Sequence, residues 1–220
     1  MHMQVKAVIF DFDGLMVESE GIAYRVWRQV VAEYGSEMSA EFYRKFIGTT
    51  PEETVVEICE SLGLPISPQE LQQRYWDQRT ETMCVEARAV DGLVALIDDL
   101  RQRRLPVGVA SNSPTSYVER VLEALQLRKK ILTVIGSDQV KQGKPAPDVY
   151  LATAEALTVD PSDIVAIEDS PTGIRSAIRA GMTCYTIPNR QLADEDFSQA
   201  HQIFRSMSAL HAHLRIVLKD

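Results

Sequence analysis

Short runs of apolar residues recur along the chain, and they lack the polar alternation of a half-exposed strand. The first run leads directly into two aspartates, in the stretch VIFDFDG at residues 8–14. Continuous apolarity is typical of strands covered on both faces, as in a parallel sheet flanked by helices. The runs predict strands over residues 5–10, 107–110, 132–136, 164–167 and 184–187.

The segments between these runs have the periodicity of amphipathic helices, because their apolar residues recur three and four positions apart and share one helix face. Strand and helix therefore alternate, and this rhythm predicts an α/β fold with a doubly wound, Rossmann-like parallel sheet. The periodic sets are Val90, Leu93, Leu96, Ile97 and Leu100, then Val118, Val121, Leu122 and Leu125, and then Tyr150, Ala154 and Leu157.

The alternation stops between about residues 18 and 86, where the pattern is almost entirely helical. The stretches TPEE and SPQE have the cap residue, proline and glutamate of a helix start. We expect an α/β core domain over residues 1–17 and 88–220 and an inserted helical cap domain over residues 18–87. Ligands of open α/β sheets bind beyond the carboxyl ends of the strands, so a domain inserted there would cover the site as a lid.

Composition and charge narrow the class of ligand. The chain has 220 residues, of which 45% are hydrophobic, and a net charge of −8, so it lacks the basic surplus that binds nucleic acid. No stretch reaches the ~20 apolar residues of a membrane span, and the first residues lack the apolar part of a secretory signal. The three cysteines have no CxxC pairing. We therefore expect a cytoplasmic protein with a small-molecule ligand and no membrane partner, a monomer rather than the alternative dimer.

Polar side chains follow three of the predicted strands at their carboxyl ends, which share one edge of a parallel sheet. Taken alone, each is explained as well by a turn residue, a helix cap or a surface lysine. Two acidic pairs aimed at one crevice, however, call for a cation, and all-oxygen ligands favour Mg²⁺ over zinc or copper. The residues are Asp11 and Asp13, then Ser111 and Asn112, then Glu168 and Asp169, with Lys144 brought in on a loop.

Four motifs, taken in order, resemble those of one family. They read DFDGLMVES, VASNS, GKPAPD and IEDSPTGIRSAIRAGM. The chain resembles phosphohydrolases of the haloacid dehalogenase (HAD) superfamily, in the branch of β-phosphoglucomutase and the phosphorylated carbohydrate phosphatases, which have a helical C1-type cap. The resemblance covers essentially the whole chain, and four ordered motifs are far more specific than the DxD pair alone. Glu18 stands where the first motif of the family has aspartate.

The resemblance implies a role for each acidic residue of these motifs. Asp11 is implied as the nucleophile, which attacks phosphorus and becomes an aspartyl phosphate. Asp13 is implied as the general acid and base, and its main-chain carbonyl as a ligand of Mg²⁺. Asp11 and Asp169 are further implied metal ligands, while Glu168 is either a direct ligand or an outer-shell partner.

The remaining motif residues are implied to bind the phosphoryl group. Ser111 would donate a hydrogen bond to a phosphoryl oxygen, and Lys144 would neutralise charge on the transferring group and hold the nucleophile ionised. Gly14 would let the backbone approach the phosphate closely. Asn112 and Thr49 complete the predicted substrate-binding residues, and Thr49 is the member contributed by the cap.

These roles predict a Mg²⁺-dependent phosphatase for small phosphorylated metabolites, with sugar and polyol phosphates as the first candidates. The alternative is a phosphomutase of the β-phosphoglucomutase type, whose cap carries a histidine and a basic pair. Ala23 stands at the histidine position, and Ile47 and Pro51 stand where the mutase has lysine and arginine, so hydrolysis is favoured. A second alternative is a phosphoacceptor switch without turnover, but such domains have no helical insertion and no acid/base equivalent to Asp13.

Overall fold

The apolar runs form parallel strands of one sheet in the computed structural model, which describes residues 5–46 and 51–218. The strand order is β3-β2-β1-β4-β5-β6, and each neighbouring pair is parallel. The predicted α/β fold with a doubly wound parallel sheet is therefore confirmed. The strands are β1 (Ala7–Phe10), β2 (Val107–Ala110), β3 (Thr133–Ile135), β4 (Ile164–Glu168), β5 (Thr183–Thr186) and β6 (Gln202–Ile203).

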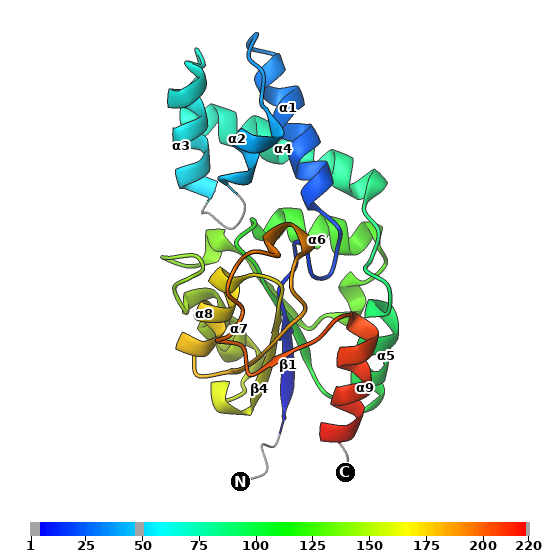
Figure 1. Cartoon of the computed structure of the whole chain (residues 1–220). Helices are drawn as coiled ribbons and strands as arrows, with labels where there is room; N and C mark the ends of the chain where they lie inside the picture. The colour runs from blue at the N-terminus through cyan, green and yellow to red at the C-terminus, as the bar shows by residue number, and fades with distance from the viewer. Residues whose placement is uncertain (1–4, 47–50, 219–220) are drawn as a thin grey trace.

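Helices cover both faces of this sheet, as Figure 1 shows on the two sides of β1 and β4. Successive side chains of a strand point to opposite faces, so Val8 and Phe10 belong to one core cluster, whereas Ala7 and Ile9 belong to the other. The first cluster packs against α5 (Leu93–Gln102), α6 (Thr115–Ala124) and α9 (Met207–Val217), and the second against α7 (Asp148–Leu157) and α8 (Pro171–Arg179).

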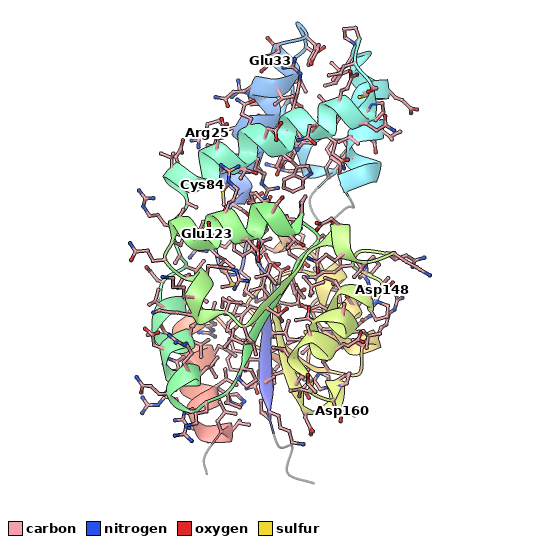
Figure 2. The ribbon with its side chains drawn as sticks, turned by 180° about the vertical axis from the view of Figure 1, so that it is seen from behind. Arg25, Glu33, Cys84, Glu123, Asp148 and Asp160 are labelled. Atoms are coloured by element: carbon pink, nitrogen blue, oxygen red, sulfur yellow. The ribbon has the colours of Figure 1, made fainter. Side chains whose placement is uncertain are left out.

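The segment between β1 and α5 forms helices that lie together beyond the carboxyl end of the sheet (Figure 1). The helix α4 packs against α1 and α3, and the rings of Trp27 and Tyr75 stack at 3.9 Å between α1 and α4. Figure 2 shows Cys84 of α4 above Glu123 of α6, where the helical segment contacts the core. The helices are α1 (Glu20–Ala32), α2 (Ala40–Arg44), α3 (Pro51–Leu62) and α4 (Pro68–Glu86).

The two connections between the helical segment and the core run side by side. Val90 N donates to Met16 O at 2.9 Å, and Val17 forms an isolated antiparallel bridge with Ala89. A tight turn precedes this point, because Gly14 N donates to Val17 O at 2.9 Å. The chain therefore leaves the core and returns to it at one place, just beyond β1.

The start of α4 follows the predicted capping box. Ser67 caps the helix by accepting from Glu70 N, and the Glu70 carboxylate accepts from Ser67 N in return. Pro68 occupies the first turn, where its missing N–H costs no hydrogen bond. The box satisfies backbone donors that the first turn would otherwise leave without a partner.

The cysteines and the helix lengths bear on the expected cellular environment. Cys59, Cys84 and Cys184 are all free thiols. Within residues 5–46 and 51–218, every helix is too short or too polar to cross a bilayer. The cytoplasmic location and the oligomeric state stay predictions.

Candidate active site

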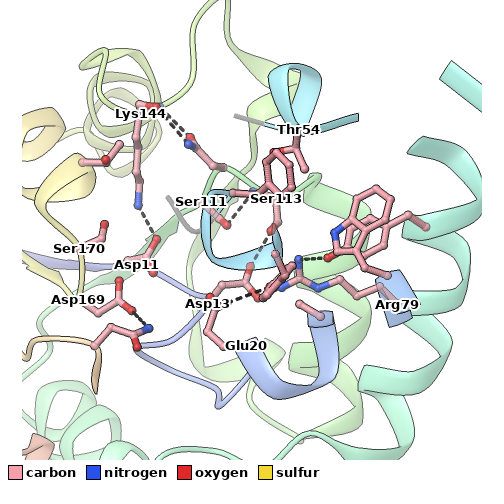
Figure 3. A pocket seen from close by; sticks show the side chains of 18 of the residues that line it. Asp11, Asp13, Glu20, Thr54, Arg79, Ser111, Ser113, Lys144, Asp169 and Ser170 are labelled. Atoms are coloured by element: carbon pink, nitrogen blue, oxygen red, sulfur yellow. Dashed lines mark hydrogen bonds and ion pairs between the residues drawn. The ribbon is translucent and has the colours of Figure 1, made fainter. Parts of the chain in front are cut away.

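A pocket lies between the carboxyl end of the sheet and the helical segment, and Figure 3 shows the side chains that line it. The core contributes the ends of β1, β2 and β4 and the loop that carries Lys144. The helices α1 and α4 contribute Glu20 and Arg79 from the opposite side. The pocket therefore has a polar floor on the core and a mixed polar and aromatic wall on the helical segment.

Lys144 joins two carboxylates at the floor of this pocket. Asp11 follows β1, and its N–H extends the sheet by donating to Ile167 O at 2.9 Å. Lys144 Nζ donates to Asp11 Oδ1 at 2.5 Å and to Glu168 Oε1 at 2.7 Å. Burial alone lowers the pKa of Lys144, but the two carboxylates raise it above its ordinary value, so the ammonium stays charged.

Glu168 is fixed from several sides at the end of β4. Its Oε1 also accepts from Tyr150 OH at 2.7 Å, and its Oε2 accepts from Asp169 N at 3.1 Å. A Cβ at Gly173 would lie 1.9 Å from Oε1, so only glycine leaves room for this carboxylate. Glu168 is completely buried. Its main structural effect is to hold the Lys144 ammonium beside Asp11.

Asp169 faces the turn that follows β1. Its Oδ2 accepts from Asn189 Nδ2 at 2.8 Å. Gly14 has φ +82°, and a Cβ at this position would lie 2.1 Å from the same oxygen. Gly14 is therefore required both by its left-handed conformation and by the close approach of Asp169.

The carboxylates of Asp11, Glu168 and Asp169 fit a divalent cation. One oxygen from each lies within 4.8 Å of the others, and all three residues are buried. Burial raises the pKa of Asp11 to about 7, where Lys144 opposes the rise and Glu168 and Asp13 add to it. Burial also raises the pKa of Asp169 well above its usual range, with help from Asp11 and Glu168. One ammonium does not balance three carboxylates, and an all-oxygen donor set is typical for Mg²⁺.

Asn112 lines the pocket, and its side-chain amide also binds the main chain of Lys144. Its Oδ1 accepts from Lys144 N at 2.7 Å, and its Nδ2 donates to Lys144 O at 3.2 Å. Ser176 Oγ donates to Ala146 O at 2.5 Å and ties the same loop to α8. Lys144 does not follow a strand, so these contacts of its loop bring it to the pocket.

Ser111 lies at the end of β2, buried against the pocket. Its Oγ accepts from Ser113 N at 3.0 Å. A hydroxyl that accepts this bond still has its own proton to donate to another oxygen. The Ser111 hydroxyl therefore has a proton available for an acceptor in the pocket.

The Asp13 carboxylate turns away from Asp11 and toward the helical segment, as Figure 3 shows. Its Oδ1 accepts from Arg79 Nη2 at 2.6 Å and from Tyr117 OH at 3.0 Å. Its Oδ2 accepts from Ser113 Oγ at 2.6 Å. Asp13 therefore connects β1, α6 and α4 through a single side chain.

Most of the predicted site residues meet in this pocket. Glu168 lies directly beneath its floor and contacts Lys144, while Gly14 packs against Asp169. Thr49, and the mutase comparison at Ile47, lie outside the described residues. The predicted residues that line the pocket are Asp11, Asp13, Ser111, Asn112, Lys144 and Asp169.

Several pocket residues were not predicted from the sequence. Asn189 follows β5, so the rule that polar residues at strand ends converge applies to it as well. Ser113 stands within the quoted VASNS motif. Arg79, which lines the pocket, and Tyr117, which contacts Asp13 without lining it, had no such signal. Each is one polar or aromatic residue among others on a helix. Arg79 is a buried cation of the helical segment, at a position other than the two where the sequence lacks the basic pair of the mutase.

Comparison with known proteins agrees with this geometry. A family model described as haloacid dehalogenase-like hydrolase matches residues 8–187. The chain belongs to this family. The predicted family and enzyme class, a phosphoric monoester hydrolase, are thereby confirmed.

Members of the family with named activities resemble the chain over most of its length. A phosphorylated carbohydrates phosphatase of Thermotoga maritima is 28% identical over 178 residues, 81% of this chain and 82% of that protein. The bifunctional riboflavin kinase/FMN phosphatase of Arabidopsis thaliana is 29% identical over 201 residues, 91% of this chain. This chain spans 53% of that protein, about half its length. CbbY from Rhodobacter sphaeroides in complex with phosphate has a TM-score of 0.87 at 25% identity, covering 94% of this chain and 96% of its own.

Proposed function

We propose that the protein is a Mg²⁺-dependent phosphatase that hydrolyses small phosphorylated metabolites, such as sugar or polyol phosphates, through an aspartyl phosphate on Asp11. The observation that carries this proposal is the Lys144 ammonium, which bridges Asp11 and Glu168 in a pocket that also contains Asp13 and Ser111. A nucleophile, an acid/base and two donors for phosphoryl oxygens are the groups that phosphoryl transfer through a carboxylate requires.

The first step would transfer the phosphoryl group to the enzyme. An oxygen of Asp11 attacks phosphorus, and the bond between phosphorus and the leaving oxygen breaks. Asp13 gives its proton to that oxygen, and the alcohol departs. Lys144 and Ser111 hold the phosphoryl oxygens, whose charge they offset in the transition state.

The second step would return the enzyme to its starting state. Asp13, now ionised, takes a proton from a water molecule, whose oxygen attacks phosphorus. The bond between phosphorus and Asp11 breaks, and inorganic phosphate leaves. Asp13 is protonated again and Asp11 is ionised, so each group ends in the state in which it began.

Mg²⁺ would be held by the carboxylates of Asp11 and Asp169 and by the main-chain carbonyl of Asp13, with Glu168 as a direct or outer ligand. When bound, the metal offsets the repulsion between the anionic nucleophile and an anionic phosphate. The three clustered carboxylates support this assignment. Their buried oxygens are hard donors, which favour Mg²⁺ over softer transition metals.

The helices α1–α4 would act as the cap that selects the substrate, with residues 18–87 as the cap domain and residues 1–17 and 88–220 as the core. Glu20, which accepts from Tyr43 OH at 3.1 Å, offers an acceptor for substrate hydroxyls. Trp27 adds an apolar ring to the wall. A hydroxylated, uncharged body suits this combination, and a relative named for phosphorylated carbohydrates supports it.

Hydrolysis is favoured over the alternatives by two residues of the pocket. Ala23 lines the wall at the position where the resemblance would place a mutase histidine, and a methyl group transfers no proton. Asp13 lines the same pocket as the nucleophile, and an acid/base there would make the aspartyl phosphate short-lived. The first point argues against a phosphomutase, and the second against a phosphoacceptor switch without turnover.

The proposal is tested by measuring phosphate release from a panel of phosphorylated sugars, polyols and nucleotides. Wild type and Asp11→Asn are compared with Mg²⁺ and with EDTA. We expect release that requires Mg²⁺, is highest for sugar or polyol phosphates, and is lost in Asp11→Asn. Release that persists in EDTA would remove the metal from the proposal, and release by Asp11→Asn would remove the covalent step.

A further inference from the structure

The proposed chemistry needs Asp13 in one orientation, yet the core alone does not provide all of the contacts that hold it. We propose that Arg79, on α4 of the helical segment, is the positioning residue for the Asp13 acid/base. This inference rests on the proposed function. It makes the helical segment part of the proton-transfer machinery as well as a cover over the pocket.

The ion pair between Arg79 and Asp13 crosses the boundary between the helical segment and the core. Arg79 Nη2 lies 2.6 Å from Asp13 Oδ1, and the two residues are 66 positions apart in sequence. The side chains are 9% and 18% exposed, so bulk water screens the contact poorly. Water competes with a surface ion pair, whereas this pair is largely shielded from it.

The guanidinium of Arg79 has little freedom to move. Its Nη1 donates to Tyr75 OH at 2.9 Å. Its Cζ lies 5.1 Å from the ring centre of Trp76 and 4.9 Å from that of Tyr117. Aromatic faces attract a guanidinium and shield it from water. Three aromatic residues thus hold the cation in the position from which it contacts Asp13.

The two carboxylate oxygens of Asp13 have different partners and therefore different roles. Oδ1 accepts from both Arg79 and Tyr117, and a carboxylate oxygen accepts about two hydrogen bonds, so Oδ1 is fully used. Oδ2 accepts from Ser113 and keeps one acceptor position. Oδ2 is therefore the oxygen that exchanges a proton with the leaving group and with water. Without Arg79, Oδ1 would keep only the longer bond from Tyr117 and regain an acceptor position, so the carboxylate would be held less firmly and the two oxygens would no longer differ in this way.

A purely structural role for Arg79 predicts different kinetics from a positioning role. Loss of the acid in the first step matters for an alcohol leaving group, which departs poorly without a proton. It matters little for p-nitrophenolate, which is a stable anion. Loss of the base slows the second step for every substrate, because that step is always the hydrolysis of the same aspartyl phosphate.

The test compares wild type, Arg79→Met, Arg79→Lys and the control Arg74→Met in rapid-mixing experiments with Mg²⁺. The substrates are p-nitrophenyl phosphate and the best sugar or polyol phosphate of the panel. Arg74 lies on the same helix and pairs with Glu33 at 2.9 Å, but it does not line the pocket. Circular dichroism and thermal unfolding establish that each variant is folded.

We expect Arg79→Met to slow the first step with the alkyl phosphate by roughly 100-fold, the size of a general-acid contribution. The rate of the p-nitrophenolate burst should change by less than about 3-fold. That change corresponds to well under the ~1.4 kcal/mol of a tenfold effect on the barrier. The steady state that follows the burst should be slower. Arg79→Lys should recover part of the loss, and Arg74→Met should behave as wild type.

Three results would overturn the inference. Equal slowing of the first step with both substrates would mean that the pocket as a whole is damaged. A higher KM with unchanged kcat would make Arg79 a substrate contact, and unchanged kinetics would make it dispensable. If wild type itself neither forms a burst nor releases phosphate, the proposed function fails, which is distinct from failure of the inference.

Discussion

Asn112 holds the main chain of Lys144 on both sides, with Oδ1 accepting from Lys144 N at 2.7 Å and Nδ2 donating to Lys144 O at 3.2 Å. Lys144 lies on the loop between β3 and α7. It does not directly follow a strand, so the sheet alone does not bring it to the pocket. One amide side chain at the end of β2 therefore fixes the position of the ammonium beside Asp11. The two residues form a unit, although 32 positions separate them.

Replacement of Asn112 should affect the chemical step more than substrate binding. In Asn112→Ala, both hydrogen bonds are lost and the loop loosens, so the ammonium is less well placed in the transition state. We expect kcat to fall about tenfold, equivalent to ~1.4 kcal/mol of transition-state stabilisation. The free energy of unfolding should fall by about 1–2 kcal/mol. Steady-state kinetics and urea unfolding measure the two effects, and an unchanged kcat would show that the loop holds its shape without Asn112.

Gly14 should control affinity for the metal through Asp169. A Cβ in Gly14→Ala would lie 2.1 Å from Asp169 Oδ2, so the carboxylate must move. We expect Mg²⁺ affinity, measured by titrating activity, to fall at least ~10-fold, as in other metal sites with a disturbed outer shell. The control is Gly35→Ala, where φ is +74° but a Cβ has no neighbour within 4 Å. It should carry the backbone strain of about 1–2 kcal/mol and keep normal affinity. Equal losses of affinity in both variants would contradict the explanation.

Two helical glycines should respond to alanine in opposite directions. In Gly173→Ala, the new methyl group would lie 1.9 Å from Glu168 Oε1, which displaces the partner of Lys144. We expect loss of activity and of stability. Gly21→Ala places a methyl group in open space on α1 and should stabilise the protein by about 0.5–1 kcal/mol through lower chain entropy. Denaturant unfolding measures the stability of both variants, and phosphate release measures their activity. A fully active Gly173→Ala would show that activity does not depend on the observed position of the Glu168 carboxylate.

Mg²⁺ should raise the melting temperature of the wild-type protein. A ligand that binds only the folded state stabilises it by ~2.7 kcal/mol at 100 times its Kd. Removal of a ligand in Asp169→Asn should abolish most of this shift, although the variant also has one buried carboxylate fewer and should be more stable without metal. Thermal unfolding with Mg²⁺ and with EDTA measures both effects. A full shift in Asp169→Asn would place the metal elsewhere.

The sheet was predictable because its strands are apolar and buried. The runs over residues 107–110 and 164–167 match β2 and β4 to within one residue. The strand β6 was missed, because Gln202–Ile203 has only two residues and both are exposed, so no periodic pattern exists. Long helices and buried strands leave a signal in the sequence, whereas a short edge strand depends on the neighbour with which it pairs.

The site was predictable where residues follow strands. Asp11, Asp13 and Asp169 stand at strand ends, and parallel strands bring such ends to one edge. The Arg79 contact was not predictable in this way, because α4 is a polar helix on which a buried arginine looks like a solvated one. The orientation of Asp13 toward α4 depends on how the helical segment packs on the core. That packing involves many side chains and follows no local motif.

The most direct test of the central claim is whether a phosphoryl group becomes attached to Asp11. Asp13→Asn is mixed with p-nitrophenyl phosphate and Mg²⁺, because this leaving group departs without a proton while the second step lacks its base. We predict a burst of p-nitrophenolate equal to the amount of enzyme, and a phosphorylated peptide containing Asp11 after acid quenching and mass spectrometry. Asp11→Asn should give neither. A burst that persists in Asp11→Asn, or turnover without phosphorylation of Asp11, would contradict the covalent mechanism.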